Sequence, residues 1–292
     1  MTALIQLVFD GALVTPKHQV SLRTLSKSMH YLQMATDRAY LDVKYEGVRK
    51  HARTPIRHYA DADFYVGPAE VGSFKIRFTA AEGAKIVKRF IRAISDPYQT
   101  ALENGEREFN VIGRQLDVRR NEIVQGGKKF PTYKEFAENP EDMDRTYGDK
   151  AIGNYVANMV TPIAKIDGAL LRIEMKPDDK TPVTRYEFNP ERAKAFKAAL
   201  GKRRLGSPVI YRGLLRMLDR GHNQTSNFKA KIINTDNDKD IAMYVHSMDD
   251  YSALAPHIDG GPIRILACPI LEYDSYDVVA GDIQFLKILD AE

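Results

Sequence analysis

The spacing of apolar residues changes at the segment GKRRLGSP, residues 201–208, and this change limits the possible folds more than the composition does. Helical spacing dominates before the segment, whereas short strand-like runs separated by turn residues follow it. The predicted strands lie at 208–216, 227–233, 240–246, 262–271 and 281–289. A helical turn capped by Ser247 separates the third strand from the fourth, which is the order of an OB-type Greek-key barrel. A small barrel of another topology would give nearly the same pattern.

The N-terminal part of the sequence predicts long helices over a small sheet. Residues 3–9 form an expected strand, and apolar residues at spacings of three and four predict a helix at 22–45 with Ser21 as its N-cap. Alternating apolar residues between 64 and 78 predict a strand pair. A second helix is expected from Glu82, broken or kinked at Pro97, with helical spacing resuming through residues 109–123. Further elements follow: strands in ALLRIEM and TPVTRYEF, and a short helix after Asn189.

These patterns predict an α+β protein of two domains. The first, residues 1–203, is a β-α-β-β-α block with a candidate subdivision at 127–148, and the second, residues 204–292, is a five-stranded OB-like β-barrel. A length of 292 residues suits two domains.

The overall charge excludes little. The sequence has 43 lysines and arginines against 39 aspartates and glutamates, which gives a net charge of +4. This excess of positive charge is smaller than that of a typical protein that coats DNA. One cysteine, Cys268, cannot form an internal disulfide, and no apolar run is long enough to span a membrane. We therefore expect a cytoplasmic protein.

Several short segments resemble an uncharacterised bacterial protein family that is associated with mobile-element and phage-defence genes. The resemblance rests on FDG at 9–11, SLRTL at 21–25, DRAYLDVKY at 37–45, GSF at 72–74 and AGDIQF at 280–285. None of these is a catalytic motif, so the resemblance implies a bacterial or phage setting and no activity.

The barrel supplies the first candidate nucleic-acid site. In an OB barrel the loops after the first and fourth strands flank the binding face. Here the first loop offers Arg220 and His222, Lys229 and Lys231 share one face of the second strand, and Phe228 and Tyr244 would stack on bases if they face outward. The opposing loop weakens this hypothesis because its carboxylates repel phosphate: Glu272, Asp274, Asp277 and Asp282. Tyr273 and Tyr276 in that loop are candidates for contact with a protein partner.

A second candidate nucleic-acid site is the basic segment between residues 44 and 58. It is the densest positive patch of the sequence, and its cationic side chains are Lys44, Arg49, Lys50, Arg53 and Arg57. Phosphate binding competes here with an ordinary solvated surface loop.

No motif of a metal or cofactor site is present, and none is expected. The histidines lack the HExxH spacing, paired cysteines and phosphate loops are missing, and TDNDKD lacks the glycine and glutamate of a calcium loop. The sequence favours a non-enzymatic binding or regulatory protein with nucleic acid as its ligand. Two alternatives stay open: a protein-interaction subunit of a multi-component defence complex, and a metal-dependent nuclease that uses Glu272, Asp274 and Asp282. A protein partner or a homo-oligomer is compatible with the sequence.

Overall fold

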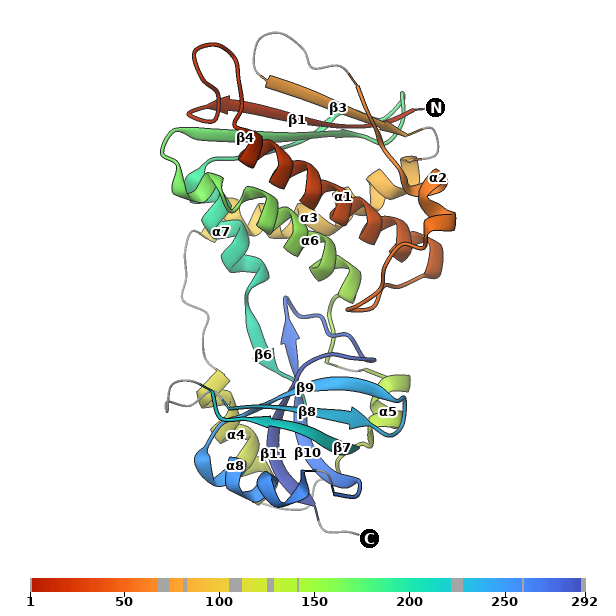
Figure 1. The fold of residues 1–292 in the computed structure, drawn as a ribbon, viewed down its shortest axis with the longest axis vertical. Coiled ribbons are helices and arrows are strands. Elements are labelled where there is room, and N and C mark those ends of the chain that lie inside the picture. The colour runs from red at the N-terminus through yellow and green to blue at the C-terminus, as the bar shows by residue number, and fades with distance from the viewer. Residues whose placement is uncertain are drawn as a thin grey trace. The chain divides into compact units, whose positions relative to one another are not determined.

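The chain folds as two compact units, and the second is interrupted by part of the first. The computed structural model describes residues 2–67, 74–80, 83–104, 112–124, 129–140, 142–221, 228–258 and 260–289. The first unit comprises residues 1–108 and 146–201, and the second comprises 109–145 and 202–292 (Figure 1). The expected domain boundary at 203–204 lies close to residues 201–202, where the chain passes for the last time from the first unit to the second. Residues 109–145, however, belong with the barrel, because their apolar side chains pack on it.

An antiparallel sheet forms one layer of the first unit. Its strands, in spatial order, are β2 (Tyr65–Val66), β3 (Phe74–Ala80), β1 (Ala3–Gly11), β4 (Ala169–Lys176) and β5 (Thr184–Phe188). Ile5, Leu7 and Phe9 alternate along β1 and are fully buried. Gln6 and Val8, which point to the opposite face, are 7% and 1% exposed, so the centre of β1 is buried on both faces.

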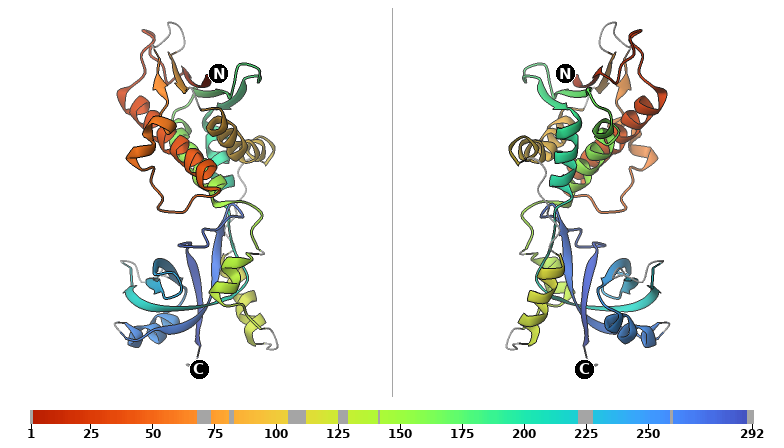
Figure 2. Two further views of the ribbon diagram at one scale, coloured as in Figure 1. Left: turned by 90° about the vertical axis from the view of Figure 1, so that its right-hand side faces the viewer. Right: turned by 90° about the vertical axis from the view of Figure 1, so that its left-hand side faces the viewer.

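Four helices cover one face of this sheet: α1 (Leu22–Tyr45), α3 (Ala84–Asn104), α6 (Tyr147–Val160) and α7 (Pro190–Leu200) (Figure 2). Ser21 caps α1 by accepting from the amide of Thr24, and Asn189 caps α7 in the same way, as expected. The remaining helical turns are η1 (Ile56–His58), α2 (Tyr59–Ala62) and η2 (Ile163–Lys165).

The second helix is not broken at Pro97, one of the two outcomes expected there. α3 continues through Pro97, with Phe90, Ile94 and Ala101 buried on both sides of it. A proline inside a helix costs about 3 kcal/mol. Burial of several large side chains along one continuous stripe is worth more than this.

The second unit contains a closed barrel. Its strands are β7 (Val209–Asp219), β8 (Phe228–Asn234), β9 (Lys239–Val245), β10 (Ile263–Glu272) and β11 (Ile283–Leu289). They are connected in the order β7-β8-β9-β11-β10, and β10 pairs back with β7. The β9–β11 pairing is parallel and the others are antiparallel. With α8 (Met248–Leu254) between β9 and β10, this arrangement confirms the predicted five-stranded OB-like barrel.

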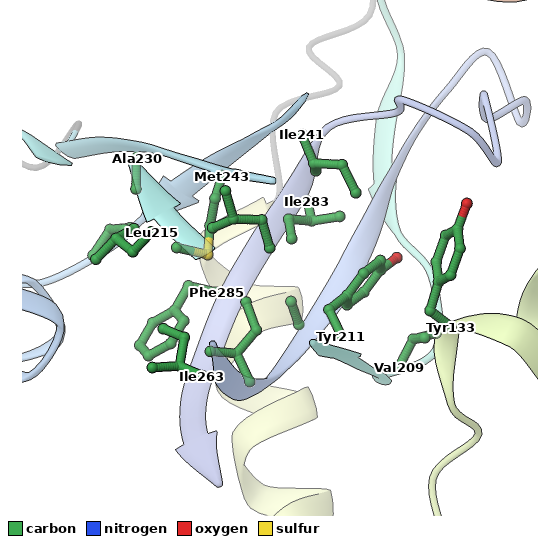
Figure 3. Close-up of a cluster of buried hydrophobic side chains, with 14 of the residues drawn as sticks. Tyr133, Val209, Tyr211, Leu215, Ala230, Ile241, Met243, Ile263, Ile283 and Phe285 are labelled. Atoms are coloured by element: carbon green, nitrogen blue, oxygen red, sulfur yellow. The ribbon is translucent and has the colours of Figure 1, made fainter. Parts of the chain in front are cut away.

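Buried side chains fill the interior of the barrel and form a packed core (Figure 3). Tyr211 of β7, Met243 of β9 and Phe285 of β11 are each at most 1% exposed. α5 (Tyr133–Glu138) adds Tyr133 and Phe136 to this core, and α8 adds Leu254.

α4 (Ile112–Val124) covers part of the outer barrel surface. Leu116 is fully buried against Leu266 and Cys268, which point outward from β10, and against Leu286 of β11. β6 (Arg203–Leu205) extends the sheet along β10. Figure 2 shows the α4–α5 segment beside the strands.

Among the described residues, no helix combines the length and apolar character that a membrane crossing requires.

Candidate nucleic-acid interface

The outer face of β7, β8 and β9 is the part of the barrel on which a ligand has room to bind. The interior is packed, and the α4 cluster covers part of β10 and β11 and also packs against Ile210 of β7 and Tyr244 of β9. On the outer face, Lys229 lies opposite Tyr244, and Lys231 lies between Met217 and Ala242. We call this surface the β8 face. It coincides with the usual ligand side of an OB barrel.

The two lysines of the β8 face point away from the core, as predicted. Ala230 and Ile232, their neighbours on β8, are buried, whereas Lys229 is exposed and Lys231 is half-buried. The Lys229 ammonium lies 5.8 Å from the centre of the Tyr244 ring, and Lys231 approaches the Asp240 carboxylate at 3.8 Å. Half-exposed pairs of this kind are weakly bound, so both ammonium groups can exchange to a phosphate.

β7 brings further cations that the sequence analysis did not select. Arg212 and Arg216 are both exposed, and Arg216 sits at an irregularity in the pairing of β7 with β8. The sequence could have predicted that Arg212 points outward, because it lies between Tyr211 and Gly213 on a strand whose side chains alternate between the two faces. Asp219 also reaches this surface, and its carboxylate accepts from the Gly221 amide at 2.9 Å.

One predicted stacking residue does not face a ligand. Phe228 is only 5% exposed and packs inside the barrel, where its ring lies 5.3 Å from that of Tyr251. The condition for base stacking at Phe228 is therefore not met, since the strand turns its side chain towards the core. Arg220 is exposed. His222 lies outside the described residues.

Three of the four carboxylates of the opposing loop are engaged within the protein. Glu272 pairs with Arg203 at 2.5 Å, and Asp274 pairs with Arg204 at 2.6 Å. Asp277 is buried and accepts from the amide of Val279. The repulsion expected from this loop is correspondingly reduced.

The same ion pairs bear on the nuclease alternative. Two-metal chemistry needs carboxylates that converge on one point, whereas Glu272 and Asp274 each face an arginine. Within the described ranges, no group of three or more histidine, cysteine, aspartate and glutamate side chains is placed to hold a metal ion.

Tyr273 and Tyr276, predicted to contact a protein partner, expose little surface for such a contact. They are 6% and 4% exposed. The Tyr276 hydroxyl donates to the Gly281 carbonyl, and the Arg145 guanidinium lies 4.5 Å from the centre of the Tyr273 ring. Both rings therefore pack in the interior of the second unit.

Tyr273 and Asp274 form a tight turn that joins the ends of the second unit's two segments. Both residues have positive φ angles, 55° and 54°. The Asp274 carbonyl accepts from the amides of Asp144 and Arg145 at 3.2 Å, and the Tyr273 amide donates to the Lys202 carbonyl at 2.9 Å. The turn thus holds the chain at the two crossings that flank residues 146–201.

The basic segment of the first unit forms a loop between α1 and η1. Arg49, Arg53 and Arg57 are exposed, and Lys50 is half-buried. Arg38, itself 7% exposed, donates to the Arg49 carbonyl at 2.8 Å and to the Lys50 carbonyl at 3.2 Å. Lys44 is turned back towards α1 and α2, where it binds Tyr40 and Asp61.

Cys268 is inert in this fold. Its side chain is fully buried beneath α4, and burial raises the pKa of its thiol to about 12. A thiol that stays protonated at neutral pH is a poor nucleophile.

No family model, no curated protein and no solved structure matches this chain.

Proposed function

We propose that the protein binds nucleic acid on the β8 face, as a non-enzymatic binding protein. The observation that carries this proposal is the cationic outer surface of a packed OB-like barrel, on which Lys229 lies over the Tyr244 ring and Lys231 follows on the same face of β8. In such barrels this face and its adjoining loops bind oligonucleotides. A bacterial phage-defence setting rests on the sequence resemblance alone and stays a prediction.

Single-stranded nucleic acid suits this surface better than a duplex. The β8 face is a sheet surface, and its described part carries no protruding helix or ribbon to enter a groove. Lys229 and Lys231 would meet phosphates, with Arg212 and Arg216 adding charge from β7. Tyr244 is half-buried between Lys229 and the α4 cluster, and the exposed part of its ring would stack on one base.

The test compares charge removal on the β8 face with equal charge removal elsewhere. Lys229→Gln with Lys231→Gln should weaken the binding of a single-stranded oligonucleotide. It should also reduce the slope of log affinity against log salt by about 0.7 for each phosphate that the variant no longer neutralises. Lys194→Gln with Lys197→Gln, two exposed lysines of α7, is the matched control and should leave both quantities unchanged. Fluorescence anisotropy over a series of salt concentrations measures them.

Two results would contradict the proposal. One is wild-type protein that shows no salt-dependent binding to single- or double-stranded nucleic acid at low ionic strength. The other is equal weakening in the α7 variant, because binding would then follow net charge and not the β8 face.

A further inference from the structure

A second group of cations gathers around one imidazole ring in the first unit. Lys44 at the end of α1 places its ammonium 2.8 Å from Nδ1 of His58 in η1. On the other side of the ring, Nε2 lies 3.1 Å from the Tyr45 hydroxyl and 3.4 Å from Nε of Arg57. Two permanent cations therefore border a histidine that is itself able to take a third positive charge.

The neighbouring groups leave this charge incompletely balanced. The described residues that face His58 are Tyr40, Lys44 and Tyr45 from α1, Arg57 beside it in η1, and Asp61 from α2. Asp61 approaches Lys44 at 3.4 Å, and its side chain is 60% exposed. Partial burial, Lys44 and Arg57 together lower the pKa of His58 more than Asp61 raises it. An anion at this point would relieve the repulsion among the cations.

The backbone beside the cluster is fixed from within the fold. Arg38 reaches from α1 to the carbonyls of Arg49 and Lys50, so the loop before η1 is anchored by a buried guanidinium. The Lys44 ammonium also donates to the Tyr40 hydroxyl at 2.7 Å, which restrains it. Cations held in place lose less conformational entropy on binding than free surface side chains do.

We propose that Lys44, Arg57 and His58 form a binding site for a phosphate group. Tyr45 contributes a hydroxyl donor, and His58 becomes a donor at both ring nitrogens when it is protonated. Lys44 and Arg57, which lie within hydrogen-bonding distance of the nitrogens of the neutral ring, would then turn their charge to the phosphate. The exposed side chains of Arg49 and Arg53 extend the positive surface beyond the site. This site belongs to the first unit and does not depend on nucleic-acid binding by the β8 face.

The imidazole of His58 is itself the probe. Its pKa, measured by NMR on histidine-labelled full-length protein, should rise by about one unit on addition of inorganic phosphate, because an anion within hydrogen-bonding distance favours the protonated ring. Sodium chloride at the same ionic strength should produce a much smaller rise. His58→Gln assigns the resonance.

Variants distinguish phosphate binding at this site from nonspecific attraction of phosphate to positive charge. Arg57→Gln removes a flanking cation and should abolish most of the phosphate effect, whereas Arg23→Gln, an exposed cation on α1, should preserve it. Lys229→Gln with Lys231→Gln should also preserve it, so failure here is distinguishable from failure of the β8 face. Oligonucleotides with and without a 5′-phosphate then identify the source: an effect of only the phosphorylated strand indicates a terminal phosphate, and an effect of both indicates the backbone. An unchanged His58 pKa in phosphate, or an equal rise in Arg57→Gln, would overturn the proposal.

Discussion

His58 gives a prediction at the scale of a single residue, because its pKa is lowered in the folded protein by partial burial, Lys44 and Arg57. The unfolded chain binds this proton more readily, at a pKa of about 6.5, so stability should fall as the pH drops from 7 to 5. His58→Gln should show a smaller fall in its urea midpoint over this range. Asp178 and Glu135, whose pKa values are also lowered, lose their contributions only at more acidic pH. Equal pH dependence in the variant and the wild type would refute this.

Single residues also mark what the sequence could and could not predict. The outward direction of Lys229 and Lys231 followed from the period of two along a strand, and Ser21 was recognisable as an N-cap from its neighbours alone. The burial of Tyr273 was not predictable, because it depends on Arg145 and on a turn contacted by residues from the distant chain segment. The pairing of Arg204 with Asp274, 70 residues apart, left no local signal either.

At the scale of an element, α4 is expected to stabilise the barrel through one buried side chain. Leu116→Ala should destabilise the second unit by about 2–5 kcal/mol, since the cavity would lie between α4 and two strands. Val118→Ala on the same helix is the control: Val118 is 56% exposed, and its loss should cost less than about 0.5 kcal/mol. Hydrogen exchange of β10 amides measures both values within the unit concerned. Similar protection in the two variants would show that α4 is not part of the barrel's cooperative fold.

The elements themselves were largely predictable, while their partners were not. The five barrel strands and the helical turn between the third and fourth followed from periodicity and turn residues, but the pairing that closes them as an OB-like barrel did not. Periodicity also identified α4 as a helix, but it does not say which surface a helix covers. Local pattern assigned 109–145 to the N-terminal block, and only packing shows that these residues complete the barrel.

At the scale of the whole molecule, the barrel strands alone should not form a stable domain. A fragment of residues 204–292 lacks Leu116, Tyr133 and Phe136, which cover apolar surface of the barrel. Joining residues 109–145 to 202–292 by a short glycine-serine linker restores them, because both ends already contact the turn at Tyr273 and Asp274. The joined fragment should unfold cooperatively in urea, whereas 204–292 should bind a hydrophobic dye and aggregate. Cooperative unfolding of 204–292 at the same midpoint would disprove this.

The interruption of the second unit also imposes an order on synthesis at the ribosome. Residues 109–145 emerge before 146–201, and the first unit is complete once residue 201 has emerged. Until β7 to β11 have been translated, the apolar faces of α4 and α5 have no barrel strands to pack against. Translation therefore completes the first unit before the barrel, whose strands close last against a segment synthesised well before them.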